Sequence, residues 1–154
     1  MAAHINRRLL LLAGGASLLA YTAPAASPAL VIKVYKDPYC GCCTAWAERL
    51  RSAGFKVDIE ERDDMDEIKK RFDVPDDLTS CHTGVIGGYV IEGHVPPNDI
   101  KRLVAKKSDA RGLAVPGMPV NSPGMEVPEA EDDPYTVWLF RKDGTRSAFA
   151  HYGA

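Results

Sequence analysis

Three of the four cysteines in this chain stand within four consecutive residues, at Cys40, Cys42 and Cys43, and the fourth is the distant Cys81. A redox dithiol or a structural disulfide needs only two cysteines. A third cysteine beside the pair therefore indicates sulfurs gathered to hold a soft metal ion. Thiolates select ions such as Cu(I), Zn(II) and the iron of iron–sulfur clusters.

The spacing of these cysteines favours copper over a single zinc ion. Four cysteines are the right number for zinc, but zinc sites usually leave two or more residues between paired ligands, whereas Cys42 and Cys43 are adjacent. Neighbouring side chains on a helix point about 100° apart, which makes a mononuclear site awkward. Bridging thiolates in a multinuclear Cu(I) site demand less of each sulfur's direction, so zinc ranks behind copper.

Histidine and methionine residues are candidates for further ligands. His94 lies at the return end of a predicted hairpin whose entry carries Cys81. Met118 and Met125 are soft thioethers in a loop rich in glycine and proline, where gap filling and copper contact both stay open as roles. His82 follows Cys81, but the alternation of a strand would direct its side chain away from that cysteine.

Length and charge narrow the class of protein. A chain of 154 residues makes one ordinary domain with a core of its own. Its formal net charge of −2 gives no basic surface for nucleic acid and no polybasic patch for anionic lipid.

The first residues predict export. Arg7-Arg8 precede an apolar run over residues 9–20, and small residues follow at Ala25-Ala26. This order is typical of a secretory signal peptide, and the run is short for a membrane span. We therefore predict a signal peptide at 1–26, used by the Sec or twin-arginine route, and a periplasmic domain at 27–154. That domain would have no stable membrane insertion, and an uncleaved anchor is the alternative.

Strands and helices alternate along the mature chain. The predicted elements are a strand at 30–36, a helix at 42–53, a strand at 55–60, a helix at 63–74, a hairpin at 85–91 and a helix at 100–107. This order predicts an α/β fold with a thioredoxin-like mixed sheet flanked by helices. A long Gly/Pro-rich loop at 108–134 and an extra C-terminal β-hairpin at 135–150 complete the single domain.

The clustered cysteines fall where the first predicted strand meets the first predicted helix. Unpaired N–H groups at a helix start lower the pKa of cysteine, so we expect thiolates at 40–43 near neutral pH. In a thioredoxin-like layout the segment that enters the hairpin faces this junction. Cys81 lies at that entry, so we expect the four sulfurs to converge from two distant segments.

Four motifs recur together in one known family. They are Tyr35-Lys36-Asp37-Pro38-Tyr39-Cys40-Gly41-Cys42-Cys43, Ser80-Cys81-His82-Thr83, Gly93-His94-Val95-Pro96 and Gly112-Leu113-Ala114-Val115-Pro116-Gly117-Met118-Pro119. With the export signal, they resemble the CopG-type periplasmic copper-resistance proteins over essentially the whole mature chain.

The resemblance implies a thioredoxin-like fold and a cysteine-bridged, multinuclear copper site. It implies copper tolerance as the role, with Cu(I)/Cu(II) interconversion as a proposed activity. Copper ions and other periplasmic copper-handling proteins are then the expected partners. Carried over by motif, the ligands are Cys40, Cys42, Cys43 and Cys81, with His94, Met118 and Met125 as further candidates.

Two other functions remain alternatives. A thiol–disulfide oxidoreductase would use Cys40 and Cys43, but Cys42 would compete for the mixed disulfide, and residues 79–83 lack the proline that thioredoxin-type enzymes place beside the dithiol. A thioredoxin-like iron–sulfur electron carrier is the third hypothesis. Export disfavours it, although the twin-arginine route would permit it.

Overall fold

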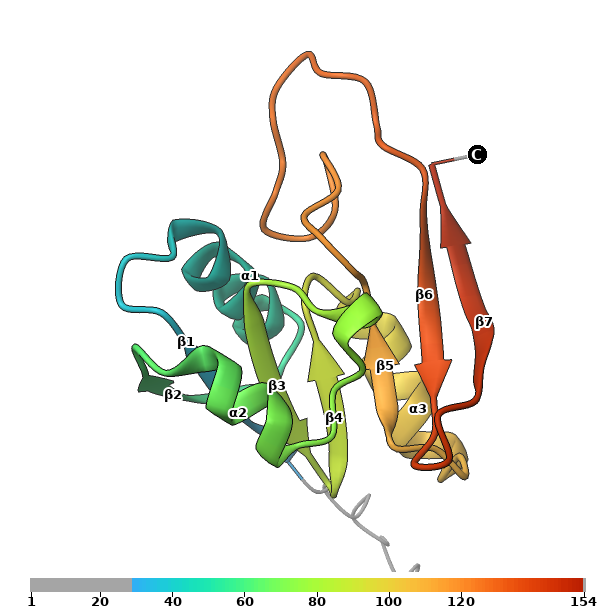
Figure 1. Ribbon diagram of the computed structural model, residues 1–154. Helices are drawn as coiled ribbons and strands as arrows, with labels where there is room; N and C mark the ends of the chain where they lie inside the picture. Colours follow the sequence, from blue (N-terminus) through green and yellow to red (C-terminus); the bar gives the residue numbers. More distant parts are fainter. Residues whose placement is uncertain (1–28, 154) are drawn as a thin grey trace, which may run out of the picture.

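The computed structural model describes residues 29–153, which form an α/β domain (Figure 1). It contains one mixed β-sheet with helices on both faces. Its elements are β1 (Val31–Lys36), α1 (Gly41–Ser52), β2 (Lys56–Glu61), α2 (Met65–Arg71), η1 (Asp76–Leu78), β3 (His82–Ile86), β4 (Tyr89–Glu92), α3 (Pro97–Lys106), β5 (Gly112–Ala114), β6 (Tyr135–Phe140) and β7 (Arg146–Tyr152). The predicted α/β fold with a mixed sheet is confirmed.

The predicted signal peptide at 1–26 lies outside the described residues, as do the first two residues of the predicted domain. Between residues 29 and 153, no helix is both long and apolar enough to cross a membrane.

The strands form a seven-stranded sheet in the order β2-β1-β3-β4-β5-β6-β7. β1 pairs in parallel with β2 and antiparallel with β3, and β3 and β4 form an antiparallel hairpin. The hairpin turns at Gly87 and Gly88, which both have positive φ, as a two-residue turn between twisted strands requires. This arrangement of the first four strands is consistent with the thioredoxin-like layout that the sequence predicts.

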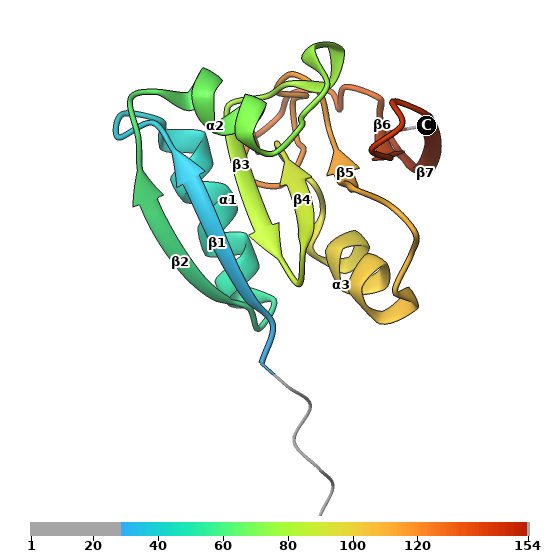
Figure 2. The same cartoon turned by 60° about the horizontal axis from the view of Figure 1, so that its bottom comes forward.

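The two faces of the sheet carry different helices (Figure 2). α1 and α3 bury Trp46, Leu50, Ile100 and Leu103 against one face, which we call the α1 face. The chain after α2 covers the other face, the α2 face, where Val74 and Leu78 pack against Val90 and Phe140. Successive residues of a strand point to opposite faces, so neighbours in β3 and β4 serve different sides.

One strand lies within the loop predicted at 108–134. β5 pairs with both β4 and β6 and joins the C-terminal hairpin to the rest of the sheet. A Cβ atom at Gly112 would stand 1.8 Å from the carbonyl oxygen of Val90, so only glycine allows this pairing. The strand is three residues long and fully buried, which gives it no alternation to detect. The rest of the loop and the predicted hairpin are present.

Candidate metal centre

The helix side of the site begins at the end of β1. The Asp37 carboxylate accepts the Tyr39 N–H (2.8 Å), and the Asp37 carbonyl accepts the Cys40 N–H (3.1 Å), which turns the chain sharply. Cys40 then occupies the N-cap position of α1, and its sulfur accepts the Cys43 N–H at 3.3 Å. The predicted junction of strand and helix is thus where the cysteines lie.

The register between β1 and β3 brings the hairpin side of the site next to these cysteines. Lys36, the last residue of β1, pairs with His82, the first residue of β3. Cys81 therefore emerges beside the turn that leads into α1. The Sγ atoms of Cys42 and Cys81 lie 3.8 Å apart, and those of Cys40 and Cys42 lie 3.5 Å apart.

All four sulfurs lie within 4.8 Å of one another, and we call this group, Cys40, Cys42, Cys43 and Cys81, the cysteine cluster. Cys40 and Cys43 are joined by a disulfide, while Cys42 and Cys81 are free thiols. The structure therefore differs from the expected row of thiolates, because two of the four sulfurs are oxidised. Reduction by two electrons would free all four as potential ligands.

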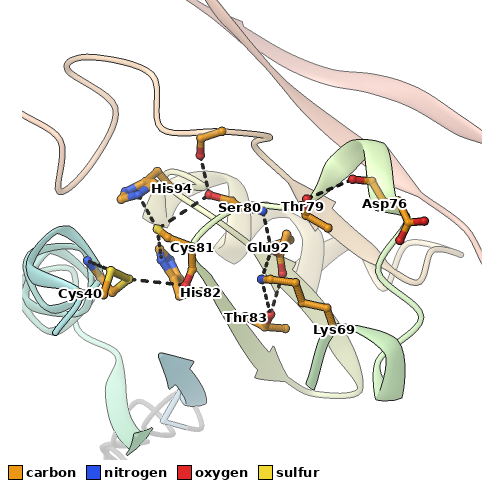
Figure 3. A network of polar contacts seen from close by, with 12 residues as sticks. Cys40, Lys69, Asp76, Thr79, Ser80, Cys81, His82, Thr83, Glu92 and His94 are labelled. Atoms are coloured by element: carbon orange, nitrogen blue, oxygen red, sulfur yellow. Dashed lines mark hydrogen bonds and ion pairs between the residues drawn. A yellow bond between two sulfur atoms is a disulfide. The ribbon is translucent and has the colours of Figure 1, made fainter. Parts of the chain in front are cut away.

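Two histidines extend the cluster on the hairpin side (Figure 3). The Sγ atom of Cys81 lies 3.2 Å from Nε2 of His94 and 3.3 Å from Nδ1 of His82, and both rings are fully buried. Nδ1 of His94 lies 2.9 Å from the Pro123 carbonyl oxygen. A carbonyl can only accept, so Nδ1 carries the proton and Nε2 presents its lone pair to Cys81.

His82 corrects the expectation that its side chain points away. Cys81 precedes β3, so the alternation of the strand does not begin until His82 itself. The His82 ring lies on the α1 face, 4.3 Å from the Trp46 ring and 5.0 Å from the His94 ring, measured between centroids. Among residues 29–153, Nε2 of His82 is the one buried side-chain nitrogen or oxygen without a hydrogen-bond partner.

Burial sets the protonation states of this group. It lowers the pKa of His94 and places the pKa of His82 well below its usual value. Both rings are therefore neutral at neutral pH, as a metal ligand must be. Burial, together with nearby Cys42, raises the pKa of Cys81 to about 12. The Cys81 thiol is therefore protonated at neutral pH.

Comparison with known proteins gives three findings. The family described as "Protein of unknown function, DUF411" matches residues 78–125. A solved structure named "Copper resistance protein copG- Form 2" is 46% identical, with a TM-score of 0.77, over 80% of this chain and 98% of that chain. "Form 1" is 45% identical over 82% and 99%, with the same TM-score. The chain belongs to the CopG family. No curated protein matches it significantly.

The loop of this CopG-family protein reaches the site through its backbone. Gly124 packs on α1, where a Cβ would stand 2.6 Å from the Trp46 nitrogen and 2.9 Å from the Cys42 carbonyl oxygen. Met118 is 53% exposed and Met125 is partly buried. Within the described part of the chain, neither thioether hydrogen-bonds to the cluster or its histidines. A ligand role for the two methionines stays a prediction.

Proposed function

We propose that this protein is a periplasmic copper-binding protein of copper tolerance that holds Cu(I) in a cysteine-bridged, multinuclear site. The observation that carries the proposal is the meeting of four sulfurs from two distant segments within 4.8 Å. The copper-resistance names of the two related structures support copper as the metal. The ligands would be the cysteine cluster and Nε2 of His94.

The donor atoms fit copper by type and by spacing. A metal–sulfur bond of about 2.3 Å lets two sulfurs on one ion lie up to about 4.6 Å apart, and the 3.5 Å and 3.8 Å separations fall within that reach. Soft thiolates and neutral imidazoles suit Cu(I). The unpartnered Nε2 of His82 is a further polar atom of the same buried group.

The cysteines could also convert copper, which would then be a substrate. A reduced Cys40–Cys43 pair can give one electron to each of two Cu(II) ions. The products are two Cu(I) ions, the Cys40–Cys43 disulfide and two protons. The electrons balance, and the disulfide form is the one that the structure contains. The released Cu(I) would find Cys42 and Cys81 as free thiols beside it.

Cu(I) titration of the mature chain tests the proposal. The protein at 27–154 is reduced anaerobically and titrated with Cu(I) against a chromophoric chelator. We expect more than one tightly bound copper per chain, because bridging sulfurs serve several ions. Saturation at one copper would contradict the multinuclear site. Absence of binding would contradict the function.

A thiol–disulfide oxidoreductase is the second candidate, and the Cys40–Cys43 disulfide at the start of α1 favours it. Against it, the Cys42 sulfur lies 3.5 Å from that of Cys40 and would intercept the mixed disulfide. Insulin reduction by a dithiol measures the difference. We expect little turnover by the natural protein, and rapid turnover that survives Cys42→Ser would reverse the ranking.

A further inference from the structure

A fully buried carboxylate lies behind the site, at the end of β4 (Figure 3). Oε1 of Glu92 accepts the Ser80 backbone N–H at 2.7 Å and lies 2.5 Å from Nζ of Lys69, and Oε2 accepts the Thr83 hydroxyl at 2.7 Å. Lys69 also donates to the Thr83 hydroxyl at 3.3 Å. We call Lys69, Ser80, Thr83 and Glu92 the Glu92 anchor.

The anchor lies on the other face of the sheet from the metal centre. Glu92 shares its face with Val90, which packs in the α2-face core, whereas His82 packs on Trp46 of α1. The Glu92 side chain is therefore not a metal ligand. It reaches the site only through the chain, because it holds the backbone of Ser80, and Ser80 precedes Cys81.

Cys81 needs such a support because it lies outside the regular elements, in the short segment before β3. β3 begins one residue later, and the 3-10 turn η1 ends at Leu78. Ser80 fills the gap with two bonds: its N–H to Glu92 and its hydroxyl to the Gly117 carbonyl. Gly93 allows the close approach, since a Cβ there would stand 2.6 Å from the Cβ of Ser80.

Stability alone does not account for this arrangement. A buried ion pair can often be replaced by apolar side chains of similar volume with no loss of stability. What an apolar pair cannot do is accept the Ser80 N–H. From this difference we infer that Glu92, held by Lys69, is a positioning residue that fixes the Cys81 sulfur opposite the helix side of the site. The inference rests on the proposed role of Cys81 as a copper ligand.

Two double variants separate the hydrogen bond from the charge. Lys69→Met with Glu92→Gln removes both charges but keeps one acceptor oxygen for Ser80. Lys69→Met with Glu92→Leu removes the acceptor as well. In anaerobic Cu(I) competition on the mature protein, we expect the Gln variant to stay within about threefold of the natural affinity. The Leu variant should lose at least about tenfold, the scale on which supporting residues act at metal sites.

Asp99→Asn is the matched control for buried carboxylates. Asp99 is also buried, at the start of α3, and accepts bonds from Tyr152 and Arg102 but none from the segment that carries Cys81. It should lower the thermal midpoint of the apoprotein and leave copper affinity unchanged. Thr83→Val, which removes one donor to Glu92, serves as a milder variant should the Leu double variant fail to fold. Thr83→Val should lower the Cu(I) affinity by a smaller factor than the Leu double variant.

The Cys81→Ser background decides whether the anchor acts through Cys81. There, the Leu double variant should cause no further loss of copper affinity, because the sulfur that it positions is already gone. Equal losses in both backgrounds, or equal losses by the Gln and Leu variants, would overturn the inference. Natural affinity in the Leu variant would overturn it too. If Cys81→Ser itself keeps natural affinity, the proposed function fails instead.

Discussion

The two sides of the candidate metal centre are built in different ways. The helix side takes Cys40, Cys42 and Cys43 from a single turn at the start of α1, and local hydrogen bonds shape it. The hairpin side takes Cys81, His82 and His94 from two strand ends, and the pairing of β1 with β3 brings it into place. A local motif can bring three sulfurs together, but only pairing between strands that are distant in the sequence adds the fourth to the same site.

The two sides also differ in how the redox state affects their sulfur atoms. The helix side holds a disulfide in this structure, and the hairpin side holds a free thiol and two neutral imidazoles. Disulfide formation therefore removes candidate ligands from the helix side only. On the proposed function, we expect the hairpin side to bind metal whether or not the helix side is reduced.

The largest expected effect comes from Cys81→Ser, which removes the only sulfur of the hairpin side. We expect Cu(I) affinity to fall at least about tenfold and the copper stoichiometry to fall with it. Cys42→Ser is the matched variant, since it removes the other free thiol from the helix side, where two sulfurs remain. Its loss should be smaller. A larger loss in Cys42→Ser would reverse the comparison.

The apo fold should survive Cys81→Ser, because the Cys81 thiol forms no disulfide and lies outside the hydrophobic core clusters. Circular dichroism and the thermal midpoint of the metal-free protein check this. Unfolding of the variant would mean that Cys81 supports the sheet, and its copper loss could not then be assigned to a missing ligand.

Oxidation gives the next effect in size. With the Cys40–Cys43 disulfide formed, we expect the copper stoichiometry to drop to one, held by Cys42 and Cys81 with help from His94. Titration of the oxidised and reduced forms side by side measures the change. Cys40→Ser with Cys43→Ser should reproduce the oxidised stoichiometry under reducing conditions. Loss of all copper on oxidation would show that the hairpin side depends on its neighbour.

Local patterns predicted the helix side and most of the fold, because helix starts and turns depend on nearby residues. Three features were not predicted from the sequence. β5 was missed because Gly112 and its neighbours show no alternation. The direction of the His82 side chain was wrong because Cys81 precedes β3, so the alternation of the strand does not relate the two residues. The ion pair of Glu92 with Lys69 depends on how the fold places α2 over the sheet, which no spacing in the sequence predicts. Each failure concerns a contact between distant segments.

The loop offers a matched pair of glycines for a smaller effect. Gly117 and Gly124 both have positive φ, in the two Pro-Gly-Met repeats, but only Gly124 packs against the backbone of α1. Alanine at either position adds strain of about 1–3 kcal/mol. Gly124→Ala should also push Pro123 away from His94 and lower the copper affinity. Gly117→Ala should lower it less, because alanine keeps the backbone carbonyl that accepts the Ser80 hydroxyl. Equal copper affinities in the two variants would argue against a role for the loop at the hairpin side.

The smallest effect on copper should come from the C-terminal hairpin, which lies apart from both sides of the site. The Tyr152 hydroxyl donates to the buried Asp99 carboxylate at 2.8 Å and ties β7 to α3. Tyr152→Phe removes that bond and leaves a buried acceptor short of a donor, so we expect a loss of about 1–2 kcal/mol in the free energy of unfolding. Chemical denaturation measures it. The Cu(I) affinity should stay unchanged, because β5 and β6 separate β7 from β4 in the sheet. A parallel loss of copper affinity would mean that the whole sheet, rather than the β1–β3 register and the Glu92 anchor, holds the hairpin side in place.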